Sequence, residues 1–340
     1  MAARPPPCRR AGRRLRTGMT APLSFDGIRV LVTGGSGFLG QHLLRALIPL
    51  GAEVTVLVRD PEASSLSDLR SGEAVRAGRV ALLRGDLFDE AAIIRAAAGA
   101  DIVFHLAGRG GGGGSFRDFT DANVTGTCNV LTACAAHTVG RLVFISSAAV
   151  YGSGSPIALD ESQPTRGRSI YAASKIAAEA LVAAYVATGR WAVTLRPSNI
   201  YGPDQMTETV VTTLLSQLGT TDEIVLRALH PVRDYIYVQD AVDALLAAAL
   251  RQDLPPGRTL NVSSGAGWSV RQLAEAAIIA MRRTESNRSV SVRPIDRPAG
   301  ALADYLVCDN AAARAALDWM PRVDLVDGLQ ASYAARLGRA

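Results

Sequence analysis

The sequence predicts an α/β fold: a doubly wound parallel sheet with a smaller, interleaved carboxyl-terminal lobe. Apolar, β-branched runs alternate with Ala-rich helical segments, and continuous apolar strands are typical of parallel sheets covered on both faces. A glycine motif separates the first apolar run from the first helical segment. The 340 residues, 48% hydrophobic and 20% charged, suffice for one large domain or two unequal lobes.

The expected elements follow one another as βαβ units. Residues 28–33 (IRVLVT) predict a strand, which leads through GGSGFLG into an apolar-periodic helix at about 41–50 and a second strand at 52–59. Further buried strands are expected at 80–86, 101–108, 141–147 and 192–202.

The predicted organisation has three parts. Residues 1–24, with three consecutive prolines and no apolar period, are expected to be a disordered Arg-rich tail. Residues 25–203 form mainly the dinucleotide-binding sheet, and residues 204–340 form mainly the interleaved lobe that closes over a substrate. The low-complexity segment 108–115 follows a strand end, and is either a flexible surface loop or a substrate lid.

Charge and composition exclude several classes of protein. Six arginines precede the first acidic residue, which leaves 36 − 6 = 30 basic against 31 acidic residues, so we expect no nucleic-acid partner. No run approaches the roughly 18 apolar residues that span a bilayer, so we expect no membrane association. The four cysteines and four histidines show no metal-ligand spacing, which predicts no metal site and a reducing, cytoplasmic setting.

The glycine motif predicts a dinucleotide site. Gly34 permits a tight turn, Gly37 lets the backbone approach a pyrophosphate, and Gly40 packs the helix against the strand. The helix amino terminus then offers N–H groups to the phosphates. No Lys-Ser or Lys-Thr pair follows, which excludes a nucleoside-triphosphatase loop.

The end of the second strand bears on the choice between NADP and NAD. A carboxylate there holds a ribose 2′-hydroxyl, whereas an arginine accepts a 2′-phosphate. The chain has Val58 and Arg59, which favour NADP, although Asp60 can still serve NAD.

Tyr171 and Lys175 are the candidate reactive pair. They lie four residues apart in YAASK, on one face of a helix, and Lys175 is the only lysine of the chain. A phenol with a pKa of about 10 is a poor base at neutral pH, and a neighbouring ammonium favours its phenolate. Ser147, at the end of the preceding strand, can orient the substrate oxygen while Tyr171 moves its proton during hydride transfer.

With these residues in place, the chain resembles the extended short-chain dehydrogenase/reductase family, and within it the nucleotide-sugar epimerase/dehydratase group. The resemblance covers about residues 27–330. The motifs that carry it are the glycine motif, GDL (85–87), HLAG (105–108), NVTGT (123–127), SSAAVYG (146–152), YAASK (171–175), LRPSNIYGP (195–203), RDYIYVQDAVDA (233–244), NVSSG (261–265) and DNAAARAALDWMP (309–321).

The resemblance implies a Rossmann fold, the roles of individual residues and a homodimer. The implied catalytic residues are Ser147, Tyr171 and Lys175. The implied cofactor-binding residues are Gly34, Gly37, Phe38, Leu39, Gly40, Arg59, Asp60, Asp86, Leu87, Leu106, Ala107, Gly108, Tyr171, Lys175 and Pro197. The implied substrate-binding residues are Ser147, Asn199, Arg233 and Arg297, and the implied dimer pairs helices near 115–137 and 171–188.

Several carried-over residues also have purely structural interpretations. Asn123 of NVTGT is more plausible as a buried hydrogen-bonding residue than as a substrate contact, and Asn199 can instead cap its loop. Arg233 can form an ion pair with Asp234. The run around Arg297 departs from the family pattern, as does the Gly-rich loop.

The residues after Ser147 decide the predicted reaction. Dehydratases of the group resemble one another in an Asp-Glu pair there and decarboxylases in a Glu, whereas this chain has Ala148 and Ala149, which offer no acid or base. We therefore expect an NAD(P)-dependent nucleotide-sugar epimerase. The alternatives are an NADPH-dependent reductase of a nucleotide-linked 4-ketosugar or related ketone and, more remotely, a dinucleotide-binding sensor without turnover.

Overall fold

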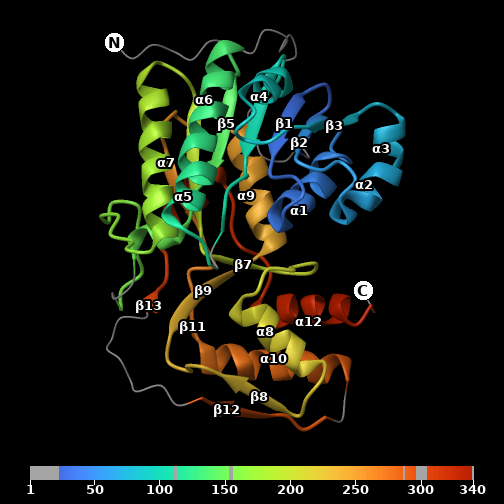
Figure 1. Cartoon of the computed structure of the whole chain (residues 1–340). Coiled ribbons are helices and arrows are strands. Elements are labelled where there is room, and N and C mark those ends of the chain that lie inside the picture. Colours follow the sequence, from blue (N-terminus) through green and yellow to red (C-terminus); the bar gives the residue numbers. More distant parts are fainter. Residues whose placement is uncertain (1–22, 111–112, 153–155, 286–287, 296–304, 339–340) are drawn as a thin grey trace. The chain divides into compact units, whose positions relative to one another are not determined.

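The structure is a computed structural model that describes residues 23–110, 113–152, 156–285, 288–295 and 305–338 (Figure 1). Residues 1–22 of the predicted tail, part of the Gly-rich loop and Arg297 lie outside these ranges. The chain divides into two compact units. Unit 1 contains the chain up to Ser146 with Ser169–Leu195 and Leu245–Thr259, and unit 2 contains Ser147–Arg168, Arg196–Ala244 and the chain from Leu260.

The main sheet has seven strands in the order β10-β6-β5-β4-β1-β2-β3. The pairs among β1 to β6 are parallel, which confirms the predicted sheet. Its strands are β1 (Arg29–Thr33), β2 (Glu53–Val58), β3 (Val80–Arg84), β4 (Ile102–His105), β5 (Arg141–Ile145), β6 (Ala192–Pro197) and β10 (Thr259–Val262).

Within unit 1, helices cover both faces of the main sheet. Leu57 of β2 packs with Ala92 and Ile93 in a core that also contains residues of the helices α6 and α7, while the neighbouring Val56 faces the opposite side, toward α1. The helical elements of this unit are α1 (Phe38–Leu47), η1 (Ser64–Leu66), α2 (Ser67–Ser71), α3 (Glu73–Arg76), α4 (Glu90–Ala97), α5 (Phe116–Phe119), η2 (Thr120–Thr125), α6 (Gly126–Ala136) and α7 (Ile170–Ala187). Helix α9 (Val238–Leu250) begins in unit 2 and ends in unit 1.

The predicted boundaries need correction at the carboxyl ends of the strands. The strands expected at 80–86 and 101–108 end at Arg84 and His105; one further backbone bond to the neighbouring strand follows each, from the N–H of Gly85 to the Val58 carbonyl at 2.9 Å and from that of Leu106 to the Thr33 carbonyl at 3.1 Å. The first helix begins at Phe38 rather than 41, since Gly37 caps it. The expected strand 192–202 is two strands, β6 and β7 (Asn199–Tyr201), in different sheets.

Unit 2 is built from shorter strands and a separate core. The strands β9 (Val232–Tyr237), β11 (Gly267–Ser269) and β13 (Tyr305–Leu306) form one sheet together with β7, and β8 (Glu223–Leu226) pairs with β12 (Ser291–Pro294). Its helical elements are η3 (Ala148–Tyr151), α8 (Val210–Leu218), α10 (Val270–Thr284), α11 (Ala311–Leu317) and α12 (Leu325–Arg336).

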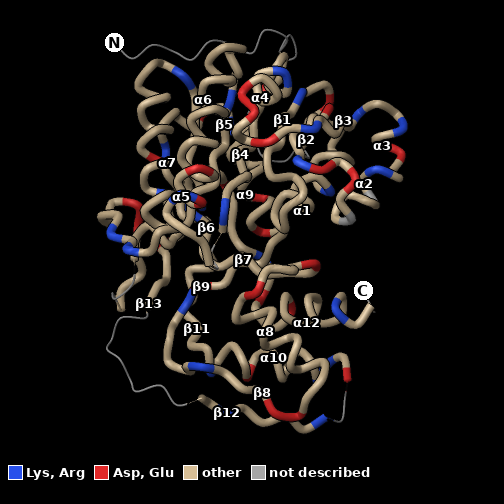
Figure 2. Tube along the Cα trace, in the orientation of Figure 1, with Lys and Arg blue, Asp and Glu red and all other residues tan. Residues whose placement is uncertain are grey.

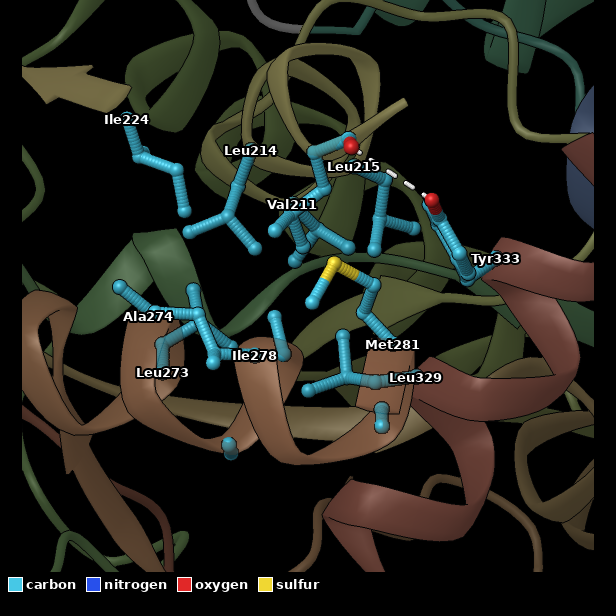
Figure 3. Close-up of a cluster of buried hydrophobic side chains, with 14 of the residues drawn as sticks. Val211, Leu214, Leu215, Ile224, Leu273, Ala274, Ile278, Met281, Leu329 and Tyr333 are labelled. Carbon is cyan, nitrogen blue, oxygen red and sulfur yellow. Dashed lines mark hydrogen bonds between the residues drawn. The ribbon is translucent and has the colours of Figure 1, made fainter. Parts of the chain in front are cut away.

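The core of unit 2 joins α8, α10 and α12 (Figure 3). Leu214, Met281 and Leu329, one from each helix, are fully buried, and the hydroxyl of Tyr333 donates to the Leu218 carbonyl at 3.4 Å. Unit 2 thus has its own apolar core, independent of the main sheet.

Charged residues are spread over both units. Figure 2 shows basic and acidic residues interspersed along the described trace. This distribution agrees with the near balance of charges counted in the sequence outside the Arg-rich tail.

Candidate active site

Close backbone packing explains the glycine motif. Gly34 directly follows β1 with φ +79°, and a Cβ there would lie 2.6 Å from the backbone nitrogen of Ala107. A Cβ on Gly40 would overlap the carbonyl oxygen of Gly34. Only glycine therefore lets the β1 turn, the start of α1 and the end of β4 approach one another.

The amino terminus of α1 is suited to an anionic ligand. Phe38, Leu39 and Gly40 form its first turn, and the capping residue Gly37 offers no side chain to their N–H groups. Open N–H groups at a helix amino terminus bind phosphate. Since Gly37 places no side chain over this helix end, and Gly34 and Gly40 let the backbone turn tightly beneath it, the described residues fit the pyrophosphate of a dinucleotide.

The residues expected near the adenosine gather at the ends of β2 and β3. Val58 is buried, whereas Arg59 and Asp60 are exposed. The Asp60 carboxylate accepts the N–H of Glu62 at 3.0 Å, and that of Asp86 accepts the N–H of Phe88 at 3.0 Å. Both predicted acidic residues thus also shape their loops.

The end of β4 completes this part of the site. The N–H of Leu106 donates to the Thr33 carbonyl at 3.1 Å, and the N–H of Ala107 to the Thr33 hydroxyl at 3.4 Å. Leu87 packs beside Gly126, where a Cβ would lie 2.7 Å from a methyl carbon of Leu87. The predicted residues of β1, β3 and β4 therefore lie along one edge of the sheet.

Lys175 is buried at this edge. Its Nζ donates to the carbonyl of Ile145 at 2.8 Å, lies 5.1 Å from the centre of the Phe144 ring, and is 3.5 Å from where a Cβ on Gly108 would stand. Burial lowers the pKa of Lys175 to about 8, and the negative charge of Glu179 opposes that shift. The only lysine of the chain is thus an ammonium whose proton is held weakly.

Tyr171 lies one helical turn before Lys175. Ser169 caps α7 by accepting the N–H of Ala172 at 3.1 Å, which sets the start of this helix. The Tyr171 ring is half-buried and packs against the ring of Phe119, with 6.3 Å between their centres. The structure thus keeps both members of the predicted reactive pair in unit 1.

Asn123 supports this helix, as the structural interpretation predicted. It is 1% exposed; its Oδ1 accepts the Arg109 N–H at 2.7 Å, and its Nδ2 donates to the Arg109 carbonyl at 3.1 Å and to the Ser174 hydroxyl at 2.8 Å. Ser174 in turn donates to the carbonyl of Tyr171 at 2.8 Å. Asn123 lies in the π-helical turn η2, which the sequence pattern did not predict.

His105 is part of the same buried network. Its ring nitrogens lie 2.8 Å from the Thr33 hydroxyl and 3.0 Å from that of Thr127. Burial, together with the positive charge of Lys175, lowers the pKa of His105 to about 3. A neutral histidine therefore lies within the electrostatic influence of Lys175.

Ser147 is the first residue of unit 2 and directly follows Ser146 of unit 1. Its side chain caps the turn η3 by accepting the N–H of Ala149 at 3.1 Å. The half-buried Ser147 hydroxyl keeps its own hydrogen for another acceptor. Lys175 donates to the carbonyl of Ile145, which precedes Ser147 by two residues in the chain.

The predicted substrate residues of unit 2 have structural partners. Asn199 donates to the Asp234 carbonyl at 2.9 Å, and Arg233 donates to the Val232 carbonyl at 3.0 Å. The Asp234 carboxylate accepts hydrogen bonds from the side chain of Ser198, from both the N–H and the hydroxyl of Ser264, and from the N–H of Gly265. Pro197 is buried at the end of β6.

Sequence reasoning missed three polar features of the two units. Glu179 accepts a hydrogen bond from Ser146, and its position one helical turn after Lys175 could have indicated it. Arg84 forms a 3.9 Å ion pair with Asp60, and its position directly before the GDL motif could have indicated it. Tyr151 bonds to both Asn261 and Arg196, for which the pattern gave no signal.

One helix among the described residues, α7, is long and apolar enough to cross a membrane. Core helices of soluble proteins have the same length and composition, so this is weak evidence. Lys175 and Glu179 lie on α7, and its residues Ala178 and Val182 belong to the unit 1 core.

Comparisons with known proteins identify relatives of this chain. The chain is 38% identical over 183 residues to the 2-alkyl-3-oxoalkanoate reductase of Stenotrophomonas maltophilia, and the match spans about half of each protein (52% and 52%). It is 32% identical over 313 residues to the dTDP-glucose 4,6-dehydratase of Streptomyces griseus, covering 90% of this chain and 93% of that protein. The crystal structure of the Thermus thermophilus UDP-glucose 4-epimerase in complex with NAD superposes with a TM-score of 0.77 and 29% identity, covering 92% of this chain and all of that one.

A family profile gives the assignment. The profile of the NAD dependent epimerase/dehydratase family matches residues 30–263, more than half of the chain. The predicted Rossmann sheet and family resemblance are confirmed. This chain is a member of the NAD dependent epimerase/dehydratase family, enzymes of the extended short-chain dehydrogenase/reductase type.

Proposed function

We propose that the protein is a nucleotide-sugar epimerase that inverts one sugar carbon by reversible oxidation and reduction with NAD(P). The observation that carries this proposal is the buried Lys175 ammonium one turn from Tyr171, on the edge of unit 1 that also bears the glycine cradle. A positive charge kept out of water favours the phenolate of a neighbouring tyrosine. A protein that only bound a dinucleotide would not need this arrangement.

The residues divide the chemistry as follows. When bound, the nicotinamide supplies an acceptor and a donor for the hydride of the sugar carbon. Tyr171 takes the proton of the sugar hydroxyl during oxidation and returns it during reduction. Lys175 keeps Tyr171 acidic and bonds the cofactor ribose, and Ser147 donates a hydrogen bond to the sugar oxygen.

Dehydration is a poor candidate although dehydratases are among the relatives. Elimination of water from a ketosugar requires an acid and a base. The turn η3 that follows Ser147 presents Ala148 and Ala149, of which Ala148 is 3% exposed. Methyl side chains cannot move protons, so the proposed reaction stops at hydride exchange.

We propose a nucleoside diphosphate sugar as substrate. The support is the likeness to the Thermus enzyme, which acts on UDP-glucose and was crystallised with NAD. Arg233 and Asn199 are proposed to bind the pyrophosphate and its surroundings, with Arg297 as a third residue. Unit 1 would then bind the cofactor and unit 2 the substrate.

Reduction of a ketone by NADPH is the second candidate. Two observations favour it: the match to a reductase of 2-alkyl-3-oxoalkanoates over half of the chain, and Arg59 after the buried Val58. We also propose a preference for NADP, because β2 ends in Val58 and not in a carboxylate that would hold the ribose 2′-hydroxyl of NAD. A reductase releases its oxidised cofactor and binds fresh NADPH in each turnover, so its affinities for NADPH and NADH can be measured by titration.

We also propose that the enzyme is a cytoplasmic homodimer. Helix α7 leaves the apolar residues Ala173, Ala183 and Ala184 exposed, although its composition suits burial. A second copy that covers α6 and α7 would bury this face. The three described cysteines are free, as in a reducing compartment.

The test is to identify what the purified protein holds. Denaturation followed by mass spectrometry is expected to release tightly retained NAD(P) or a nucleotide sugar, because an epimerase never needs to release its cofactor. NMR should then show conversion of UDP-glucose, or another nucleotide sugar of a panel, to its 4-epimer without added reductant. An empty protein that oxidises NADPH only with ketone substrates would replace the epimerase by the reductase, and failure to bind either dinucleotide would contradict both.

A further inference from the structure

Arg84 lies beside the end of the strand that sets cofactor choice. It is the last residue of β3, and its Cα pairs with that of Val58, the last residue of β2. Residues in register on neighbouring parallel strands project their side chains to the same face of the sheet. Arg84 and Val58 therefore share one face at the carboxyl edge.

That face is the side of the glycine cradle. Val56 alternates in phase with Val58, and a Cβ on Gly35 would overlap the side chain of Val56. Leu57 points the other way, where a Cβ on Gly85 would lie 2.8 Å from its methyl carbon. Arg84 thus stands on the α1 side, where the helix amino terminus offers its N–H groups to a dinucleotide.

The ion pair that Arg84 forms with Asp60 is weak. Its guanidinium lies 3.9 Å from Asp60 Oδ1, and the two side chains are 70% and 59% exposed. The same carboxylate oxygen also accepts the N–H of Glu62 at 3.0 Å. An exposed ion pair of this length contributes little to stability, so an anionic ligand can displace it.

We propose that Arg84 is a second residue that binds the 2′-phosphate of NADP, acting with Arg59. The inference rests on the NADP preference proposed above. Arg59 follows β2 and Arg84 ends β3, so two guanidinium groups flank the position where NAD-specific proteins use a carboxylate. Guanidinium groups bind phosphate through paired N–H donors, and two of them hold it more tightly than one.

The test compares two nucleotides that differ only in the 2′-phosphate. Adenosine 2′,5′-bisphosphate and 5′-AMP are titrated by calorimetry into the protein after its bound cofactor has been removed. Arg84→Ala should weaken binding of the bisphosphate about ten-fold, the loss of one charged hydrogen bond, and change 5′-AMP binding less than two-fold. Arg84→Lys should restore part of the affinity.

Arg95→Ala is the matched control, because it removes one positive charge from the last turn of α4 and should leave both affinities unchanged. If Arg84→Ala binds both nucleotides like the wild type while Arg59→Ala loses the bisphosphate, Arg84 has no role and the NADP preference stands. Equal weakening of both nucleotides by Arg84→Ala would also overturn the inference. Equal binding of both nucleotides by the wild type would contradict the NADP preference itself.

Discussion

The two units use buried polar residues for different purposes. In unit 1, Asn123 bonds to Ser174, whose hydroxyl donates to the Tyr171 carbonyl, and Lys175 bonds to the Ile145 carbonyl at the edge of a regular parallel sheet. In unit 2, Asp234 and Asn261 bond loops to short strands that pair over few residues. The buried polar residues of unit 1 therefore fix the helix that carries the proposed reactive pair, whereas those of unit 2 hold together strands that pair over few residues.

A pair of tyrosines, one in each unit, gives the largest predicted contrast. Tyr171→Phe should lower kcat about 10²- to 10⁴-fold, since it removes the proposed acid–base group, with unfolding and cofactor binding nearly unchanged. Activity assays, thermal unfolding and cofactor titration measure the three quantities. Loss of the fold would instead make Tyr171 a structural residue.

Tyr151→Phe is the counterpart in unit 2. The Tyr151 hydroxyl donates to Asn261 Oδ1 at 2.7 Å and accepts from Arg196 at 2.9 Å, and burial raises its pKa to about 12. Its loss should cost about 1–3 kcal/mol of unfolding free energy and leave kcat of the folded protein close to wild type. A kcat loss as large as that of Tyr171→Phe would remove the contrast between the units.

Asp234→Ala tests the polar hub of unit 2. The carboxylate is fully buried, and its removal leaves the N–H groups of Ser264 and Gly265 without their acceptor. We expect a loss of about 2–4 kcal/mol in denaturant unfolding. Asp327→Ala in the exposed ion pair with Arg283 should cost less than about 1 kcal/mol, and equal losses would contradict the proposed hub.

Glu179→Gln should produce a smaller, pH-dependent effect in unit 1. The negative charge of Glu179 raises the pKa of Lys175, which burial lowers to about 8. Without that charge the pKa of Lys175 falls further, so the alkaline limb of the kcat profile should move to lower pH, by about one unit. His105 does not titrate in this range, because its pKa is about 3.

Ser146→Ala is the matched control for Glu179→Gln. It breaks the hydrogen bond between Ser146 and Glu179 but leaves the charge in place. The alkaline limb should then stay where it is in the wild type. Equal shifts in both variants would mean that the hydrogen bond, and not the charge, acts on Lys175.

The features that the sequence predicted correctly are those that depend on residues close together in the chain. Alternating apolar strands and helices, the Gly34 turn and the Tyr171–Lys175 spacing are local patterns, and the structure bears out the sheet and the helix that they predicted. The strand ends were placed too late. The GDL motif continues the apolar run of β3 in the sequence, but Asp86 lies in a loop beyond Arg84, where its carboxylate accepts the N–H of Phe88.

The remaining features depend on register and long-range bonds. Arg84 shares the α1 face of the sheet with Val58 only because β2 and β3 pair these two residues, and a single sequence does not reveal that register. The π-helical turn that holds Asn123 has no periodicity of its own. Asp234 was interpreted as a possible partner of Arg233, whereas Ser198, Ser264 and Gly265 occupy its carboxylate.

The most direct test of the central claim follows the hydride itself. The purified enzyme is incubated with UDP-glucose that carries deuterium at C4, and the product is analysed by NMR and mass spectrometry. The account predicts the 4-epimer with the deuterium still at C4, because oxidation and reduction occur without release of the cofactor. Deuterium found in a released reduced cofactor (NADPH or NADH) would mean hydride transfer in one direction only, and deuterium lost to water would mean no hydride transfer; either result would contradict the epimerase.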